Sequence, residues 1–204
     1  MSRLALNKSS LQQENARLKT FERFLPSLDL KRRQLIAERA RAARQCAATE
    51  AEMAAVRDQV GSELPMLGNR RIELERLVWV ERVETREENL LGTRLPRLVQ
   101  VEIGVRSYPL LGLPHWVDGV AARLRQLLEL RVRLQIEQAR LQRLEVAVQK
   151  VTQRVNLFDK VLIPRTRENI RRIRIYLSDT ERAGVVRAKI AKSRHADLAT
   201  EAAR

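Results

Sequence analysis

The sequence predicts an all-α-dominated fold: a long antiparallel two-helix coiled coil with a small β-hairpin or irregular insert between the helices. The main observation is a pair of seven-residue repeats of apolar residues, separated by a segment with a different period. The composition agrees, because aromatic residues make up only 3% of the 204 residues and there are just 7 glycines and 6 prolines. A sheet-rich fold with many turns would need more of each.

The first apolar stripe predicts a helix from about residue 27 to about residue 67. Its members fall in two rows, each with a spacing of seven residues. The rows are Leu28, Leu35, Ala42, Thr49 and Val56, and Leu25, Arg32, Arg39, Cys46, Met53, Val60 and Leu67. Because several members are small or polar, we expect a thin seam rather than a tight zipper.

The second stripe is stronger and predicts a left-handed supercoil, because a strict heptad must keep facing one partner. Its rows are Val120, Leu127, Leu134, Leu141, Val148, Val155 and Leu162, and Leu130, Leu144, Val151 and Phe158, with Arg123 and Glu137 as exceptions. Around Pro164 the phase slips by one residue, to Ile163, Ile170 and Leu177. We expect a kink at this proline, which removes a helical hydrogen bond.

The segment between the stripes has the period of a strand. Residues 99–105 alternate Val or Ile with polar or glycine residues, which is typical of a strand with one buried face. Glycines and prolines cluster between residues 92 and 114, where a helix is not expected to continue. The predicted division of the chain is a first helical segment at 1–69, an insert at 70–115, a second helical segment at 116–194 and a disordered tail at 195–204.

The formal net charge of +15 is concentrated near the two ends of the chain. Residues 1–44 hold 11 basic and 4 acidic residues, and residues 161–194 hold 10 basic and 3 acidic residues. Helices that fold back antiparallel would bring these two segments to one pole. Because like charges repel, such a pole needs an acidic surround or a high salt concentration.

No pattern in the sequence predicts a catalytic, metal or cofactor site. A glycine-rich phosphate-binding loop is absent, and His115 and His195 lack cysteine or carboxylate neighbours at ligand spacing. Cys46 lies on the first stripe and is expected to be a buried thiol. Glu87 and Glu88 are adjacent, whereas acid–base carboxylates come from separate elements that line a cleft. We therefore expect no cofactor and no enzymatic activity from this chain alone.

Secretion and direct membrane insertion are not predicted either. No apolar run approaches the roughly 20 residues of a spanning helix, and the amino-terminal residues lack the pattern of a signal peptide. The single cysteine cannot form an internal disulfide. A membrane-surface helix is disfavoured, because both tryptophans lie at the insert. We expect a cytoplasmic chain that reaches a membrane only through partners.

Two interpretations of this basic helical chain stay open from the residues alone. One is a protein-interaction coiled coil whose basic pole enters a partner with acidic walls. The other is a basic coiled-coil nucleic-acid-binding protein, because arginine-rich helices and a pI near 11.2 are typical of phosphate binding. Against the second, the arginines between residues 165 and 187 have only Tyr176 among them for base stacking.

The carboxyl-terminal half resembles the D subunit of V-type and archaeal-type ATPases, whose pattern reads RRVN, then IP, then a helix with an acidic–basic pair and lysine-rich turns. The matching residues are Gln153, Arg154, Val155 and Asn156, then Ile163 and Pro164, then Ile170, Ile173, Leu177, Glu181, Arg182, Lys189 and Lys192. LDLKRRQL at residues 28–35 is similar to the family's LLKxKRDEL. The insert matches a glycine turn and a later Leu-Pro through Asn89, Leu91, Gly92, Leu95 and Pro96.

Two positions depart from this family pattern. Pro26 lies where the family has a basic RGH stretch before LLK, and it is expected to interrupt the helix. Gln153 replaces the first arginine of RRVN.

The resemblance implies a non-catalytic rotor axle that couples ATP synthesis or hydrolysis to ion translocation across a membrane. The implied partners are the catalytic and non-catalytic ATPase ring subunits, the small F subunit of the central stalk and the funnel-shaped subunit on the membrane rotor ring. The residues expected to contact the ring wall are Lys31, Arg32, Arg33, Arg165, Arg167, Arg171, Arg172 and Arg174. Trp79, Val99, Val101 and Trp116 are candidates either for docking the insert on a partner or for its own core.

Overall fold

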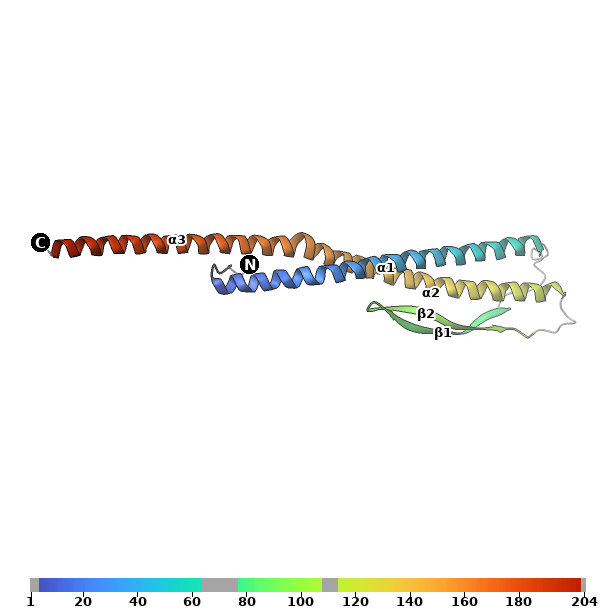
Figure 1. Ribbon diagram of the computed structural model, residues 1–204. Helices are drawn as coiled ribbons and strands as arrows, with labels where there is room; N and C mark the ends of the chain where they lie inside the picture. The colour runs from blue at the N-terminus through green and yellow to red at the C-terminus, as the bar shows by residue number, and fades with distance from the viewer. Residues whose placement is uncertain (1–3, 64–76, 108–113, 203–204) are drawn as a thin grey trace. The chain divides into compact units, whose positions relative to one another are not determined.

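The computed structural model describes the backbone of residues 4–63, 77–107 and 114–202. Two long helical stretches with an antiparallel β-hairpin between them confirm the predicted fold class (Figure 1). The elements are helix α1 (Lys8–Glu63), strands β1 (Val78–Leu90) and β2 (Thr93–Val105), helix α2 (Trp116–Leu157), a π-helical segment η2 (Phe158–Leu162) and helix α3 (Ile163–Ala202).

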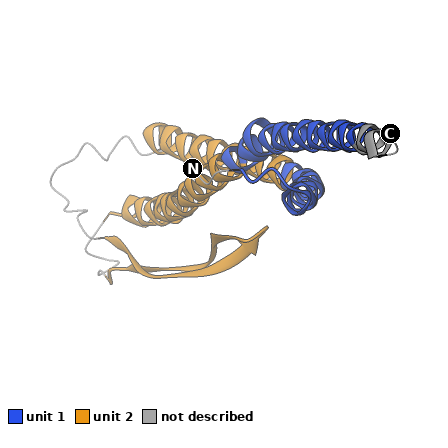
Figure 2. Cartoon of the chain, turned by 90° about the vertical axis from the view of Figure 1, so that its left-hand side faces the viewer, with its two compact units in different colours: residues 1–30, 152–204 blue, residues 31–151 orange. Residues whose placement is uncertain are grey.

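The chain forms two compact units, each built on an antiparallel pair of helices (Figure 2). Unit 1 contains residues 1–30 and 152–204, and unit 2 contains residues 31–151. In unit 1 the start of α1 lies beside α3, where Arg167 Nη2 is 2.8 Å from Glu22 Oε1. In unit 2 the rest of α1 lies beside α2, where Arg123 Nη2 is 2.9 Å from Glu63 Oε2.

The predicted heptad of the first stripe forms the buried seam of α1. Glu14, Leu35, Ala42, Thr49 and Val56 are buried and differ by multiples of seven. Helix α1 begins well before the expected start near residue 27, and the Asn7 side chain caps it by accepting a hydrogen bond from the Ser10 N–H at 2.7 Å. The same seam therefore serves both units.

The phase slip of the second stripe coincides with η2. The Ile163 N–H donates to the Phe158 carbonyl five residues back, so this turn holds one residue more than an α-helical turn. Val155 before the slip and Ile163 and Ile170 after it are all buried. The extra residue thus keeps both segments of the stripe on the packed face, and the backbone irregularity expected at Pro164 lies in the turn just before it.

The expected helix break at Pro26 was wrong, because α1 runs through this proline without interruption. Proline inside a helix removes one backbone hydrogen bond and costs about 3 kcal/mol. Its neighbours Leu25 and Leu28 are half-buried on the seam, and their packing helps to offset this cost. The segment expected to be a disordered tail also continues as helix, to Ala202. It is rich in alanine and contains neither glycine nor proline, a composition that favours helix.

The hairpin lies in unit 2 and contains the predicted strand. Its two-residue turn, Leu91–Gly92, has φ values of 52° and 77°, the left-handed conformation that matches the twist of paired strands. The register shifts twice, between Val80 and Arg82 and between Glu84 and Thr85. The base of the hairpin is held by an apolar cluster of Leu77, Val117, Val120 and Ala121, with Val78, Trp116 and Leu124 packed against it.

Candidate interaction surfaces

The five arginines predicted on α3 all lie exposed in unit 1. Arg167 pairs with Glu22 of α1, and Arg172 pairs with Glu168 of its own helix at 3.0 Å. Arg165, Arg171 and Arg174 make no ion pair with any residue that the structure describes. Arg171 and Arg174 border a shallow groove of about 420 Å³ between α1 and α3. These arginines are therefore the part of the predicted set with charge left for a partner.

The predicted amino-terminal basic group belongs to unit 2 and is already engaged within the chain. Lys31 is half-buried, and its Nζ lies 3.6 Å from the point where a Cβ on Gly92 would stand, so it lies against the hairpin turn. Arg32 and Arg33 also have interactions within the chain. The structure thus assigns the two predicted groups to different units, and it brings Lys31 to the hairpin.

Unit 1 has the higher density of positive charge. It holds 18 basic and 9 acidic residues, whereas the larger unit 2 holds 22 basic and 16 acidic residues. Among the residues that the structure describes, the ion pair farthest along α3 from η2 joins Glu181 to Lys8 at 3.9 Å. Helix α3 continues past this point to Ala202, beyond the first residue of α1 (Figure 1). This extension exposes Val185, Val186 and Ile190 among basic residues.

The four insert residues predicted for docking or for a core divide between these roles. Trp116 is part of the hairpin-base cluster, and Val101 is half-buried. Trp79 and Val99 remain 45% and 55% exposed. The Trp79 ring covers Gly104, since a Cβ at that glycine would lie 2.5 Å from the ring. Only Trp79 and Val99 of this group are therefore available to a partner.

The family motif on the helix flanks the π-helical segment. Val155 and Ile163 are buried on the seam, whereas Arg154, Asn156 and Pro164 are exposed. Two positions of the motif are thus explained by packing. The exposed three lie on the faces that α1 does not cover, and they remain candidates for contact with a partner.

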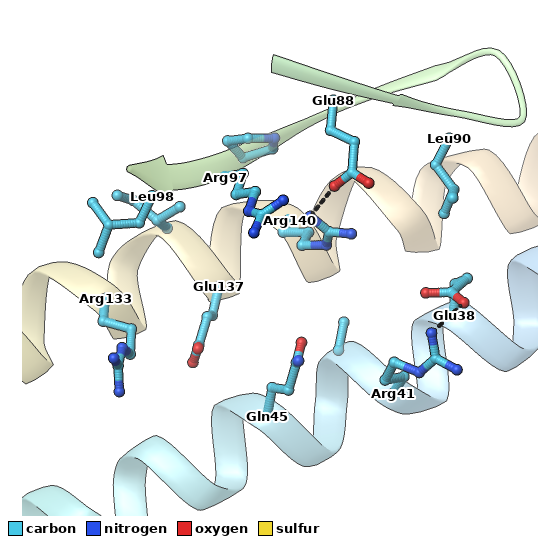
Figure 3. Close-up of a pocket in the computed structure, with 13 residues that line it drawn as sticks. Glu38, Arg41, Gln45, Glu88, Leu90, Arg97, Leu98, Arg133, Glu137 and Arg140 are labelled. Carbon is cyan, nitrogen blue, oxygen red and sulfur yellow. Dashed lines mark hydrogen bonds and ion pairs between the residues drawn. The ribbon is translucent and has the colours of Figure 1, made fainter. Parts of the chain in front are cut away.

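A polar cavity of about 460 Å³ lies under the hairpin in unit 2 (Figure 3). The Arg140 guanidinium bridges to Glu88 of β1 at 3.1 Å, and Arg143 donates to Glu87 at 3.5 Å and to the Arg94 carbonyl at 3.2 Å. Glu137 of α2 and Gln45 of α1 also line the cavity, and their side chains extend into the space between the two helices. Glu87 and Glu88, the adjacent glutamates for which the sequence predicts no catalytic role, thus hold the hairpin to α2 through ion pairs.

Sequence reasoning missed the polar contacts that cross between the helices. Thr49 Oγ1 donates to Glu137 Oε2 at 2.8 Å in unit 2, and Asn169 Nδ2 donates to Glu14 Oε2 at 3.2 Å in unit 1. A signal was present, because Thr49 and Glu137 interrupt the two apolar stripes. The two stripes, considered separately, could not predict that Thr49 and Glu137 contact each other.

The described residues hold a buried thiol, and no metal site or membrane-spanning helix is found among them. Burial raises the pKa of the Cys46 thiol, with smaller contributions from the negative charges of Glu137 and Glu50, so the thiol stays protonated near neutral pH. No group of three or more His, Cys, Asp or Glu side chains in the described ranges could hold a metal ion. Among the same residues, no helix is long and apolar enough to cross a bilayer.

The fold and these surfaces define a class of protein in which two long helical stretches pair antiparallel within each unit and a β-hairpin lies between them in the sequence. A family model for the D subunit of ATP synthase matches residues 10–193. The chain belongs to this family, which confirms the resemblance carried by its sequence. It is 32% identical to the D subunit of the V-type ATP synthase of Borreliella burgdorferi over 193 residues, covering 95% of both chains. It is also 32% identical over 195 residues to the corresponding D subunit of Chlamydia muridarum, covering 95% of this chain and 96% of the relative.

Proposed function

We propose that this protein is the non-catalytic central-stalk subunit, or rotor axle, of a V-type or archaeal-type rotary ATPase. Membership of the D-subunit family along almost the whole chain carries the proposal. In this role it couples ATP synthesis or hydrolysis in a ring of partner subunits to ion translocation across a membrane. ATP chemistry belongs to the ring, and the chain is peripheral to the membrane, on its cytoplasmic side.

The structure supports an axle in two ways. Each unit is a helix pair locked by a buried heptad seam, which gives the stiffness that transmission of torque requires. Unit 1 also offers exposed arginines and an extension of α3 without a partner helix. We assign Arg165, Arg171 and Arg174 to contacts with the ring wall, because exposed guanidinium groups form polar contacts that are sensitive to salt and can break and re-form.

The hairpin is assigned to the other partners named by the resemblance, the small F subunit or the funnel-shaped subunit. Trp79 and Val99 are the residues we assign to this contact, because their side chains stay exposed. The base of the hairpin, by contrast, is packed against α2. The nucleic-acid interpretation gains no support from the family match, and we do not adopt it.

Reconstitution with the ring subunits tests this function. The chain is co-expressed with the large ATPase subunits, and assembly and ATP hydrolysis are measured with and without it. We expect the Arg171→Gln, Arg174→Gln double variant to co-purify less with the ring at low salt. This difference from the parent should shrink as salt is raised, because salt screens the same contacts in the parent. The matched control is Arg125→Gln with Arg131→Gln, two exposed arginines on α2 of unit 2.

Failure of the parent chain to assemble with any ATPase ring would contradict the proposal. Tight, steeply salt-dependent binding to DNA in the absence of a ring would favour the nucleic-acid alternative instead. If the two double variants lose assembly equally, the assignment of the α3 arginines is wrong while the axle role stands.

A further inference from the structure

The polar residues that interrupt the two apolar stripes meet each other across the helix pair of unit 2. Thr49, only 4% exposed, interrupts the seam of α1, and Glu137 interrupts the seam of α2. Thr49 Oγ1 donates to Glu137 Oε2 at 2.8 Å. The other interruption of the α2 seam, Arg123, pairs with Glu63 at 2.9 Å. Each polar position in the α2 seam thus has a partner on α1.

The apolar residues around Thr49 give little definition of how the helices are aligned along their length. A heptad seam that slides by seven residues, about 10 Å, returns seam positions to seam positions. The buried residues around Thr49 are the small Ala42, Cys46 and Val56. Side chains of this size interlock weakly, so they give little preference for one alignment over the next.

The Thr49–Glu137 hydrogen bond does distinguish these alignments. A slide of seven residues places Glu137 opposite Ala42 or Val56, neither of which has a polar side chain. The half-buried carboxylate would then lose its donor, which is unfavourable because a buried acceptor is left without a hydrogen bond. The ion pair between Arg133 and Glu52 also crosses the pair, but at 3.8 Å and about half exposed it contributes little.

We propose that Thr49 and Glu137 are register-determining residues that hold α1 and α2 in a single axial alignment. A polar residue at a coiled-coil seam is the best-attested device for this purpose, and it acts against alternative alignments rather than for stability. Nothing in this inference depends on the rotor role. If the axle function holds, a fixed alignment keeps the hairpin at a constant position along the helices.

Unit 1 carries a second pair of the same kind, an independent observation of the device. Glu14 is 5% exposed at a seam position of α1, and its carboxylate accepts hydrogen bonds from Asn169 of α3 at 3.2 Å and from Arg17 at 2.7 Å. A slide of seven residues would place Asn169 opposite Asn7 or Phe21, leaving Glu14 without its partner on α3.

Thiol cross-linking in the full chain tests the proposal. In a Cys46→Ala background, three cysteine pairs report three alignments through a short thiol-specific cross-linker. Glu52→Cys with Arg133→Cys reports the observed alignment, and Gln45→Cys or Gln59→Cys with Arg133→Cys reports a slide of seven residues in either direction. With Thr49 and Glu137 in place, only the first pair is expected to link efficiently.

In the Thr49→Val, Glu137→Leu double variant we expect the two shifted pairs to link several-fold more. The single variant Glu137→Gln, which retains Thr49, should keep the single alignment, because its amide oxygen can still accept a hydrogen bond from the Thr49 hydroxyl. This result would distinguish loss of the hydrogen bond from loss of packing in the double variant. The matched control is Glu145→Leu, the same change at an exposed position of α2. Helicity is followed by circular dichroism in every variant.

Links confined to the observed alignment in a helical double variant would overturn the proposal. Equal shifts in the Glu145→Leu control would overturn it as well. If the double variant loses its helicity, Thr49→Val alone decides the matter, because it removes only the donor. Shifted links in that variant support the proposal, and their absence overturns it.

Discussion

The two units use one seam on α1 but stabilise it differently. Unit 2 pairs α1 with a heptad of α2 that keeps its phase and adds a hairpin, whereas unit 1 pairs α1 with η2 and α3, where the heptad slips by one residue. Of the largest side chains with less than 2% exposure, Leu35, Leu95, Leu144 and Val117 lie in unit 2, and Ile173 lies in unit 1. Leu95 belongs to the hairpin and Val117 to its base, so the hairpin and its base supply half of this group in unit 2. The seam of unit 1 has no such addition, and its phase slip requires a local change of the helix.

The largest expected effect is a loss of unfolding free energy when one core side chain of either unit is truncated. Leu144→Ala and Ile173→Ala should each lower the free energy of unfolding by about 2–5 kcal/mol, because each removes a fully buried side chain. Both tryptophans, Trp79 and Trp116, lie in unit 2, so tryptophan fluorescence reports unit 2 alone. In urea, Leu144→Ala should shift the fluorescence transition, and Ile173→Ala should shift mainly the helical signal in circular dichroism.

The matched control for these substitutions is Val146→Ala, which removes a side chain that is 45% exposed. It should change the unfolding free energy by less than about 1 kcal/mol. If Ile173→Ala moves the fluorescence transition as far as Leu144→Ala does, the two units unfold together and their separation has no thermodynamic meaning.

A second prediction concerns the extra residue in η2. Deleting the exposed Lys160 should convert the π-helical turn to an α-helical one, because Ile163 and Ile170 then fall in the heptad of Val155. We expect the unfolding free energy to stay within about 1–2 kcal/mol of the parent, since the packed residues remain on the packed face. Thermal unfolding followed by circular dichroism measures this.

Deleting Arg172, an exposed residue of α3 outside the π-helical turn, is the control for this experiment. That deletion rotates Ile173 off the seam by about 100°, so it should cost about as much as losing a core side chain. Equal damage from the two deletions would show that η2 is not the site of the phase slip.

A third effect, no larger than the second, is expected at the hairpin, the element that unit 1 lacks. Gly104→Ala places a Cβ 2.5 Å from the Trp79 ring and must displace it. Because Trp79 is 45% exposed and can move, we expect a loss of about 1–2 kcal/mol and a red shift of tryptophan emission. Arg106→Ala, at an exposed position just after β2, is the control. An unchanged emission spectrum in Gly104→Ala would contradict the stacking of Trp79 on this strand.

Much of the fold could be predicted from the sequence, because heptad spacing and strand alternation record which face is buried. Leu35, Ala42, Val56, Leu144 and Ile170 were all placed on the packed face by spacing alone. Even the phase slip was visible. The sequence could not show which backbone change produces the slip, because a kink at Pro164 and an added residue in η2 give the same shift in the spacing of apolar residues. The break expected at Pro26 failed because local propensity was given more weight than packing on the seam.

The candidate surfaces were less predictable than the fold. Spacing shows that an arginine is off the seam but not whether a carboxylate on another element neutralises it. Thus Lys31 lies against the hairpin turn and Arg167 pairs with Glu22, while Arg171 and Arg174 keep their charge for other contacts. Contacts between distant segments, such as Glu88 with Arg140, depend on how the insert folds back, which no local pattern encodes.

The smallest expected effect is a pH dependence at Cys46, which lies on the seam in unit 2 and has no counterpart in unit 1. Burial, together with Glu137 and Glu50, raises the pKa of this thiol above its ordinary value of 9.0. The unfolded chain therefore loses the proton first as the pH rises. The stability that the protonated thiol contributes is complete below pH 9.0 and declines above it, toward the pKa of the folded state.

Urea unfolding at pH 7.5 and pH 9.5 measures this effect, with Cys46→Ala as the variant without the thiol. The difference in unfolding free energy between parent and variant should shrink at the higher pH, because only the parent gains a stabilised unfolded state. The thiol should also react more slowly with a thiol reagent in the folded chain than in urea. A difference that stays constant between the two pH values would mean that burial on this seam leaves the thiol as free to ionise as it is in the unfolded chain.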